Sequence, residues 1–249
     1  MSRMIKIDKF SRSAVDIIVP FYGAYQKVAR LIESIIFATK SNPYQICLVD
    51  DCSPNDQFIE LIQKAPQIIT FKTPKRLGFA GALKYGFERT EQPWVIFMHS
   101  DCVVVDQGWM IEMGRSLLKW QEKKEPVKMV SARTDNPGEG IDRRLKARQK
   151  TNSNDVILEE GYLPLFCSMA PRKLFEKIGF LKEYFPCWYE DEEFAFRMKS
   201  AGYKQGICGR SWVKHDGGVT INKDKFAHKA MEENRTRCIE DMKLLMSKV

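Results

Sequence analysis

WVIFMHSD, residues 94–101, is the stretch of this sequence that decides the fold. Five uninterrupted apolar residues open it, a length and composition typical of a strand buried on both faces of a parallel sheet. Asp101 follows at the carboxyl end of that strand, the edge at which open α/β sheets bind ligands. Its carboxylate can bind a hard divalent cation through oxygen. The alternative interpretation is that residues 99–101 form only a polar turn.

Apolar runs alternate with helical periodicities on both sides of this stretch. The predicted strands cover residues 15–19, 46–49, 68–71, 94–98 and 127–132. The predicted helices cover residues 24–38, 79–89 and 109–120, and a further helix opens at Ser53-Pro54. Because the connections are short, we expect parallel strands with right-handed crossovers. The expected fold class is therefore α/β: a single domain with a Rossmann-like, mostly parallel sheet flanked by helices, and a C-terminal helical tail.

The alternation ends at Arg133, where a polar segment of residues 133–155 begins. Its basic run, residues 143–150, is either a solvated loop or short exposed helix, or a mobile basic lid that binds an acceptor. Order resumes with strands predicted over 163–170 and 205–208 and helices over 171–178 and 190–200. The last predicted helix, 226–249, is amphipathic, and the residues expected to pack back on the domain are Phe226, Ile239, Met242 and Leu245.

Composition narrows the class of protein. The 249 residues are 44% hydrophobic, enough for a full core, and contain no apolar run of the roughly 20 residues that span a membrane. The first ten residues lack the apolar core of a signal peptide, so we expect a cytoplasmic protein. Seven cysteines without a C-x-x-C pair indicate free thiols rather than a zinc cluster. The net charge of +8 favours anionic partners: nucleotides, nucleic acids or a membrane surface.

Acidic side chains follow two of the predicted parallel strands. Asp50 and Asp51 end the second strand, and Asp101 follows the fourth, so all three are expected at one edge of the sheet. Carboxylates there, in a basic protein, suit a cation that bridges them to an anionic ligand, such as a nucleoside diphosphate with Mg²⁺ or Mn²⁺. Lys75 and Arg76, in the loop after the third strand, can pair with phosphate.

Two common nucleotide-binding motifs are absent from the sequence. The glycines at 78 and 81 do not form G-x-G-x-x-G, and G-x-x-x-x-G-K-[ST] does not occur. The sequence therefore argues against a dinucleotide-binding fold and against a P-loop kinase.

Four consecutive carboxylates, residues 190–193, open the predicted helix 190–200. The helix dipole alone favours anions at this end. However, Trp188 and Tyr189 precede the carboxylates, and a carboxylate among aromatic rings suits a base or a group that binds a sugar hydroxyl. His215 is followed by Asp216 and two glycines. A lone histidine is more often structural, but this one can complete a metal site begun by Asp101.

Five segments in this order resemble the family 2 glycosyltransferases, which have the GT-A fold. The resemblance runs from residue 15 to residue 218 and rests on residues 15–22, 47–53, 77–83, 99–101 and 189–203. Each segment alone is a weak signal, but the five together, in order and at suitable spacing, are specific. His99 stands where the family's D-x-D motif has its first acid, and Glu193 replaces the last acid of E-D-x-D.

The resemblance implies a GT-A domain over residues 1–222 and a C-terminal amphipathic helix over 223–249. The donor-binding half would be about 14–132 and the acceptor and catalytic half about 133–222. The implied activity is an inverting, metal-dependent transfer, with Mn²⁺ or Mg²⁺, from a nucleoside-diphosphate sugar to a hydroxyl group of a glycan or lipid-linked saccharide. A UDP- or dTDP-sugar is favoured as donor.

The resemblance also implies roles for individual residues. Asp191 would be the catalytic base, Asp51 would hold the nucleobase, and Asp101 and His215 would bind the metal. The implied nucleotide-sugar-binding residues are Pro20, Phe21, Tyr22, Asp51, Arg76, Gly78, Ser100 and Asp101. The implied acceptor-binding residues are Trp188, Tyr189 and Glu190.

Alternative functions remain open on the sequence. A sugar nucleotidyltransferase shares the α/β layer and the metal, although residues 20–24 lack the glycines and basic residues of its usual loop. A non-catalytic GT-A-like binding protein is a second alternative. A nucleic-acid binder would use residues 143–150, but no recognised motif accompanies them, and we expect no nucleic acid. Peripheral membrane contact is compatible with the charge, and the oligomeric state is not predicted.

Overall fold

The computed structural model describes residue 10 and residues 13–40, 42–54, 65–138, 141–217 and 227–247. The strands are β1 (Val15–Phe21), β2 (Tyr44–Asp50), β3 (Ile68–Lys72), β4 (Trp94–Met98), β5 (Cys102–Val104), β6 (Val127–Thr134), β7 (Val156–Leu158), β8 (Cys167–Pro171) and β9 (Lys204–His215). The helices are α1 (Tyr25–Ala38), α3 (Gly78–Phe87), α4 (Trp109–Glu122), α5 (Arg172–Ile178), α6 (Glu190–Ser200) and α7 (Ala227–Met246), with a 3₁₀ turn η2 (Arg143–Leu145).

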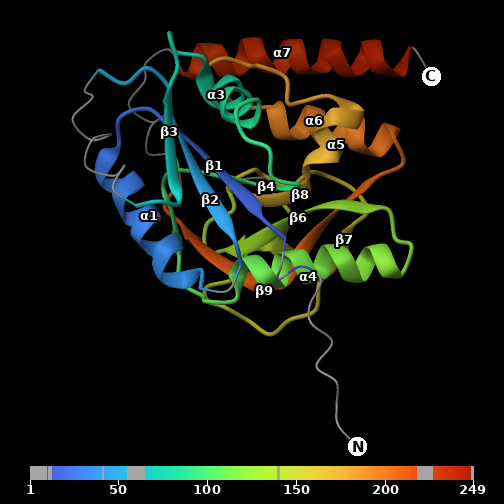
Figure 1. Ribbon diagram of the computed structural model, residues 1–249. Coiled ribbons are helices and arrows are strands. Elements are labelled where there is room, and N and C mark those ends of the chain that lie inside the picture. Colours follow the sequence, from blue (N-terminus) through green and yellow to red (C-terminus); the bar gives the residue numbers. More distant parts are fainter. Residues whose placement is uncertain are drawn as a thin grey trace, which may run out of the picture.

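The described strands form one sheet in the order β3-β2-β1-β4-β8-β6-β9-β5, and β7 pairs with β9 (Figure 1). Strands β1 to β4, β6 and β9 run in one direction, and β5, β7 and β8 run in the other. The expected mostly parallel α/β sheet is therefore confirmed. Strand β8 lies antiparallel between β4 and β6. The strands predicted over 94–98 and 127–132 are therefore not neighbours in the sheet.

The predicted bounds of helices and strands agree best with the structure where the sequence pattern is strongest. The strand 94–98 and the helix 190–200 coincide with β4 and α6. The strand predicted over 163–170 begins only at residue 167, and the strand predicted over 205–208 is the first part of the longer, irregular β9. Strands β5 and β7 were not predicted, because three residues are too few for a periodicity. The helix predicted after Ser53-Pro54 lies outside the described residues.

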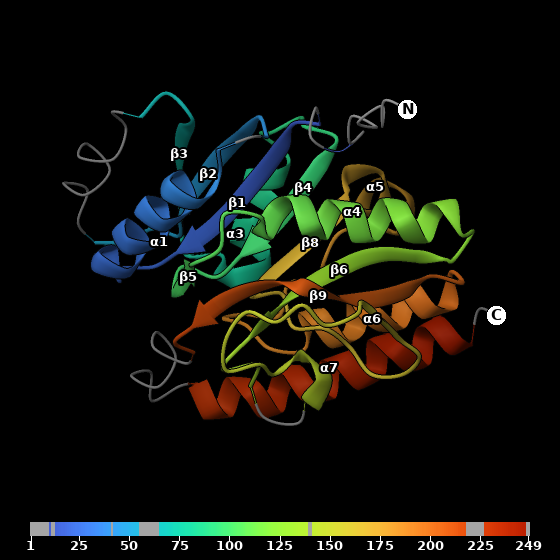
Figure 2. The ribbon, with the colours of Figure 1, turned by 90° about the horizontal axis from the view of Figure 1, so that it is seen from below.

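Two apolar layers form the core, one on each face of the sheet. Helices α1 and α4 cover one face, and α6 and α7 lie on the opposite side (Figure 2). The side chains of β1 alternate between the layers, as the pleat requires. Ile17 and Val19 pack with the α1 and α4 layer, and Ile18 packs with residues of α3, α5 and α6. The sheet is thus buried on both faces, which explains its continuous apolar runs.

The basic segment 143–150 is anchored on the domain rather than being a free loop. Leu145 is fully buried, and the indole N–H of Trp212 donates to the carbonyl oxygen of Ala147 at 2.8 Å. Two of its basic groups already have acidic partners: Arg144 pairs with Asp142, and Lys150 pairs with Asp106 at 2.6 Å. The expectation of a short helix is met by the single turn η2.

One of the residues of the last helix that were expected to pack back on the domain, Ile239, was predicted wrongly. Ile239 is 43% exposed, whereas Asn234 and Cys238 are the buried residues of α7. Met242 and Leu245 are half-buried as expected, and Phe226 lies outside the described residues. The two buried positions that were missed are a polar asparagine and a cysteine, which a search for hydrophobic periodicity does not select. No helix in the described part of the chain is long and apolar enough to span a membrane.

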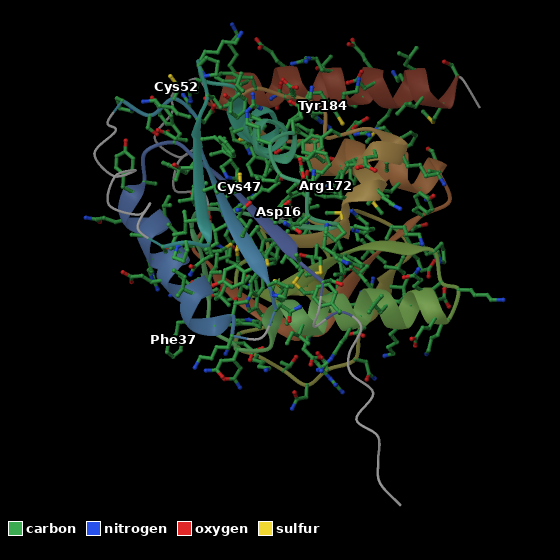
Figure 3. All side chains as sticks on the ribbon, viewed as in Figure 1. Asp16, Phe37, Cys47, Cys52, Arg172 and Tyr184 are labelled. Atoms are coloured by element: carbon green, nitrogen blue, oxygen red, sulfur yellow. The ribbon has the colours of Figure 1, made fainter. Side chains whose placement is uncertain are left out.

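A buried ion pair joins the start of β1 to α5. Arg172 donates to the carboxylate of Asp16 at 2.9 Å, and Asp16 is fully buried (Figure 3). The same guanidinium donates to the hydroxyl of Thr90 and to the carbonyl oxygens of Phe87 and Gln92. The side chain of Arg172 therefore connects three segments: the end of α3, the residues just before β4 and the start of β1.

We predict that Arg172→Met lowers the free energy of unfolding by about 3–5 kcal/mol, because it leaves a carboxylate buried without its partner. Urea unfolding followed by circular dichroism measures this change. The matched control is Lys173→Met, since Lys173 is the exposed next residue of the same helix. Equal free energies of unfolding for the two variants would contradict a stabilising role of the Arg172–Asp16 ion pair.

Candidate active site

One cavity of about 630 Å³ lies where β1, β2 and β4 end and α3 and α6 begin. All residues for which the family resemblance implied a role line it: Pro20, Phe21, Tyr22, Asp51, Arg76, Gly78, Ser100, Asp101, Trp188, Tyr189, Glu190, Asp191 and His215. Asp50 and Lys75, which the strand-end pattern grouped with them, do not line it, and Asp50 is fully buried. The volume falls in the range of small-molecule and cofactor sites. Residues up to 195 positions apart in the chain therefore meet in one place, although their individual roles stay predictions.

Three possible metal ligands cluster on one side of this cavity. The ligand atoms of His99, Asp101 and His215 all lie within 4.8 Å of one another. His215 Nε2 lies 3.2 Å from His99 Nδ1 and 3.3 Å from Asp101 Oδ1. His99 and Asp101 follow β4, and the antiparallel pairing of β5 with β9 places His215 opposite Cys102. Sheet pairing therefore brings the histidine to the strand-end acid.

The second ring nitrogen of His215 fixes its orientation. Nδ1 lies 2.8 Å from the carbonyl oxygen of Asn136, which only accepts, so Nδ1 carries the proton. The ring of Phe166 stacks on the imidazole at 5.2 Å, and the carboxylate of Asp135 accepts from the His215 backbone N–H. Nε2 is thereby presented to the cluster. Histidines that bind metals are usually held in this way through their other nitrogen.

The electrostatics of the cluster suit a cation. Burial raises the pKa of Asp101, but the hydrogen bond and charge of His215 outweigh it and lower the value to about 2. Burial and the neighbouring His215 lower the pKa of His99 to about 4. Burial also lowers the pKa of His215, but Asp101 outweighs this and raises it overall. Near neutral pH, Asp101 is ionised and His99 is neutral, the forms that bind metals.

His99 is the cluster member that sequence reasoning did not count as a ligand. It was treated as a departure from the first acid of D-x-D. The residue type alone could have identified His99 as a possible ligand, because imidazole is a common ligand of first-row transition metals. With two imidazole nitrogens and one carboxylate oxygen, the residues present fit a first-row transition metal better than magnesium, which prefers oxygen ligands.

The carboxylate of Asp51 holds the first turn of α3. Its oxygens accept from the backbone N–H groups of Leu77 at 2.7 Å and Gly78 at 2.9 Å, and from the hydroxyl of Thr73 at 3.2 Å. Burial raises the pKa of Asp51 overall, although these hydrogen bonds oppose the rise. A carboxylate offers about four lone-pair sites. Three of them are occupied, so one is left to face the cavity.

Gly78 is required where α3 meets the segment before α6. Its φ of +79° is unfavourable for other residues, and a Cβ atom there would lie 2.6 Å from the carbonyl oxygen of Pro186. That carbonyl accepts from the backbone N–H of Phe79 at 2.8 Å. The N-terminus of α3 therefore joins the two sides of the cavity.

A flat cationic platform lies beside this turn. The guanidinium of Arg76 stacks over the ring of Tyr22 at 4.0 Å, and both residues line the cavity. Such a pair offers a face for a planar ring and a positive charge for a phosphate.

The four consecutive carboxylates do not act alike. Glu193 is fully buried and pairs with Arg197 at 2.7 Å, so it belongs to the core. Glu190, Asp191 and Glu192 line the cavity at the N-terminus of α6. The two residues before them, Trp188 and Tyr189, have left-handed backbones with φ of 80° and 72°. This turn aims the first carboxylates into the cavity.

Burial shifts the titration of this pair of carboxylates. Burial and the neighbouring charge of Asp191 raise the pKa of Glu190 well above its ordinary value. Burial likewise raises the pKa of Asp191 to about 7, against the hydrogen bond from the Glu192 N–H. Within the described residues, Glu190 Oε2 has no hydrogen-bond partner. A carboxylate that titrates near neutral pH is suited to accept a proton in a reaction.

Comparison with known proteins decides the family. Residues 16–179, well over half of the chain, match the family model Glycosyl transferase family 2. The chain belongs to this family. The family model covers nearly all of the strands from β1 to β8, with His99 and Asp101 after β4, and ends before α6, β9 and α7. Membership favours the glycosyltransferase interpretation over the nucleotidyltransferase and the nucleic-acid binder.

Relatives and solved structures of this family 2 protein agree on its fold. The O-antigen biosynthesis protein RfbC of Myxococcus xanthus is 19% identical over 226 residues, covering 84% of this chain and 18% of RfbC. The structure of GalNAc-T7 with UDP, GalNAc and Mn²⁺ superposes with a TM-score of 0.65 at 15% identity, over 92% of this chain and 48% of that one.

The mannosyltransferase PcManGT of Pyrobaculum calidifontis, in complex with GDP-Man and Mn²⁺, superposes with a TM-score of 0.64 at 14% identity, over 96% of this chain and 65% of that one. The fold of the family 2 protein is therefore GT-A, as expected. The chain spans about a fifth of the length of RfbC and about half that of GalNAc-T7.

Several cavity residues of the family 2 protein were not predicted. They come from segments without a local motif and include Pro137, Ile141, Tyr162, Leu165, Cys187 and Met231. Only tertiary packing brings them to the site, and the sequence carries no signal for it.

We predict that Asp191→Asn stabilises the protein more at pH 8 than at pH 5. The folded pKa of about 7 lies above the unfolded value of 3.8, so the parent loses stability as the pH rises between them, and the amide does not. The gain should be about 1–2 kcal/mol larger at pH 8. Without screening, each unit of the pKa shift would correspond to ~1.4 kcal/mol. We expect a smaller difference, because solvent screens the charge of the half-buried Asp191.

Urea unfolding at the two pH values measures this difference, with Glu240→Gln, an exposed carboxyl on α7, as the control. A stability gain that does not depend on pH would contradict the raised pKa of Asp191.

Proposed function

We propose that this chain is an inverting glycosyltransferase that moves a sugar from a nucleoside-diphosphate sugar, with UDP- and dTDP-sugars favoured, to a hydroxyl group of a glycan or lipid-linked saccharide. One observation carries the proposal. A cluster of cation ligands and a carboxylate with a pKa near 7, Asp191, line the same cavity at the strand ends. Family membership and the Mn²⁺ and nucleotide ligands named for GalNAc-T7 and PcManGT support it.

His99, Asp101 and His215 are the residues that would hold the metal, and we propose Mn²⁺. The bound cation would stabilise the charge that develops on the diphosphate as its bond to the sugar breaks. Arg76 adds a second positive charge for the phosphates. In this assignment the donor half is about 14–132 and the acceptor half about 133–222.

The nucleobase is proposed to lie against Pro20, Phe21 and Tyr22, where β1 ends. Asp51 shapes this pocket through the turn of α3, and its remaining lone pair would accept from an N–H of the base. Uracil and thymine both carry such an N–H group, so this pocket is compatible with the UDP- and dTDP-sugars that the proposal favours.

Asp191 is proposed as the base. Its carboxylate accepts the proton of the acceptor hydroxyl while that oxygen attacks the anomeric carbon from the face opposite the diphosphate. The new C–O bond forms as the bond to the phosphate oxygen breaks, and the diphosphate leaves with the bonding electrons. The configuration inverts in one displacement, so no second nucleophile is needed.

The acceptor is proposed to bind between the aromatic residues Tyr162, Trp188 and Tyr189, which suit the apolar face of a sugar ring. Glu190 keeps its proton beside ionised Asp191, because burial and the neighbouring charge of Asp191 raise the pKa of Glu190 well above its ordinary value. A protonated Glu190 can then donate to an oxygen of the acceptor and orient it.

We predict that one of UDP, dTDP, GDP, CDP and ATP raises the melting temperature only when Mn²⁺ is present. A ligand at 100 times its dissociation constant adds about 2.7 kcal/mol of stability, which thermal denaturation measures readily. His99→Ala and His215→Ala should each remove the metal-dependent part. Lys214→Ala, the neighbour of His215 on β9 that does not line the cavity, should keep it.

No response to any nucleotide, with or without metal, would count against a donor site. A response that His99→Ala leaves intact would show that this imidazole is not a ligand.

We predict that Asp191→Asn lowers the transfer rate by about 10²–10⁴, the usual contribution of a general base, and leaves the Mn²⁺-dependent nucleotide response in place. The parent rate should rise with pH up to about 7 and then level off, because Asp191 must be ionised to accept the proton. Release of nucleoside diphosphate between pH 5.5 and 8.5 measures both effects. Transfer by the asparagine variant at the parent rate would exclude Asp191 as the base.

A further inference from the structure

Asn234 of α7 is a buried polar side chain that holds the segment leading into the candidate active site. It is 2% exposed. Its Nδ2 donates to the carbonyl oxygen of Phe185 at 3.0 Å and to that of Cys187 at 2.9 Å. The side-chain amide of Asn234 therefore donates to the carbonyl groups on both sides of Pro186. The segment that contains these carbonyls has no regular secondary structure.

The carbonyl between these two is held from the opposite side. The carbonyl oxygen of Pro186 accepts from the backbone N–H of Phe79 in the first turn of α3. Three consecutive carbonyl groups are thus fixed alternately by α7 and by α3. The segment 185–187 is clamped between the donor-side helix and the last helix of the described chain.

This clamp immediately precedes an unfavourable backbone. Trp188 and Tyr189 are bulky residues with positive φ, a conformation that costs on the order of 1–3 kcal/mol for each residue and persists only when its surroundings enforce it. Glu190 and Asp191 follow directly at the N-terminus of α6. The position of both carboxylates depends on the turn, and the turn depends on what holds residues 185–187.

Other contacts of α7 lie on the same helical face. Met231 lines the cavity, the thiol of Cys238 lies 3.9 Å from the carbonyl oxygen of Tyr189, and Asp241 accepts from the hydroxyl of Tyr184 at 2.7 Å. With Asn234 these positions are spaced by three, four and three residues, the spacing of one helix face. Figure 3 shows Tyr184 directly beneath α7.

We infer that Asn234 is a positioning residue of the active site: by bonding the carbonyls of Phe185 and Cys187, it fixes the turn that presents Asp191 to the acceptor. The inference rests on the proposed function for its catalytic consequence, but not for its structural one. Helix α7 lies outside the region that matches the family model, so this support belongs to the chain's own C-terminal part.

Hydrogen exchange read by mass spectrometry tests the structural part without any substrate. In Asn234→Ala, the amides of residues 187–191 and of Phe79 should exchange at least tenfold faster, while peptides of β1 and β4 keep their parent rates. Asn234→Gln, which retains the two N–H bonds, should recover most of the protection. Thr236→Ala, an exposed residue bonded only within α7, should match the parent.

Unchanged exchange at residues 187–191 in Asn234→Ala would overturn the inference. Equal acceleration in β1 and β4 would also overturn it, because that pattern reports a general loss of stability.

The catalytic part is tested with the nucleotide identified in the Mn²⁺ panel. Asn234→Ala should bind that nucleotide with Mn²⁺ within twofold of the parent and should transfer sugar at least tenfold more slowly, with Asn234→Gln intermediate. Parent-like transfer combined with locally faster exchange would overturn the positioning role. If no nucleotide binds the parent, the proposed function fails, and the exchange result still decides whether Asn234 holds the turn.

Discussion

The hydrogen bonds from the N-terminus of α3 to Asp51 are the constraint on which the cavity depends. Asp51 holds the N–H groups of Leu77 and Gly78, which leaves the next N–H, that of Phe79, directed at Pro186. Gly78 allows this approach because no side chain stands between the two backbones. A carboxylate at the end of β2 thereby determines where the segment before α6 lies. The end of β2 and the segment before α6, on two sides of the cavity, are therefore joined through three consecutive backbone amides.

The cavity contains carboxylates in two opposite electrostatic environments. Beside two imidazoles, Asp101 has a pKa lowered to about 2 and stays ionised. At the start of α6, burial raises the pKa of Asp191 to about 7. Environments that separate the pKa values of similar groups are a usual way to assign different roles to them. One carboxylate is suited to bind a cation permanently, and the other is suited to exchange a proton during turnover.

The sequence predicted well which residues at the strand ends line the cavity, because these signals are local. A strand that ends in an acid places that acid at the sheet edge without knowledge of the rest of the fold, which is why Asp51 and Asp101 lie in the cavity. His99 was missed because it was compared with a motif rather than read as a ligand. The insertion of β8 between β4 and β6 could not be predicted, since strand order depends on long-range pairing.

The opposite wall of the cavity was harder to predict for a physical reason. It comes from loops and helices that meet only through tertiary contacts, such as Tyr162 and Met231. Two buried residues of α7, Asn234 and Cys238, contact backbone carbonyls rather than apolar side chains, so hydrophobic periodicity did not select them and selected the exposed Ile239. A helix that supports an irregular turn must supply hydrogen-bond donors to that turn. A buried asparagine within an otherwise charged helix is therefore informative about the segment it holds.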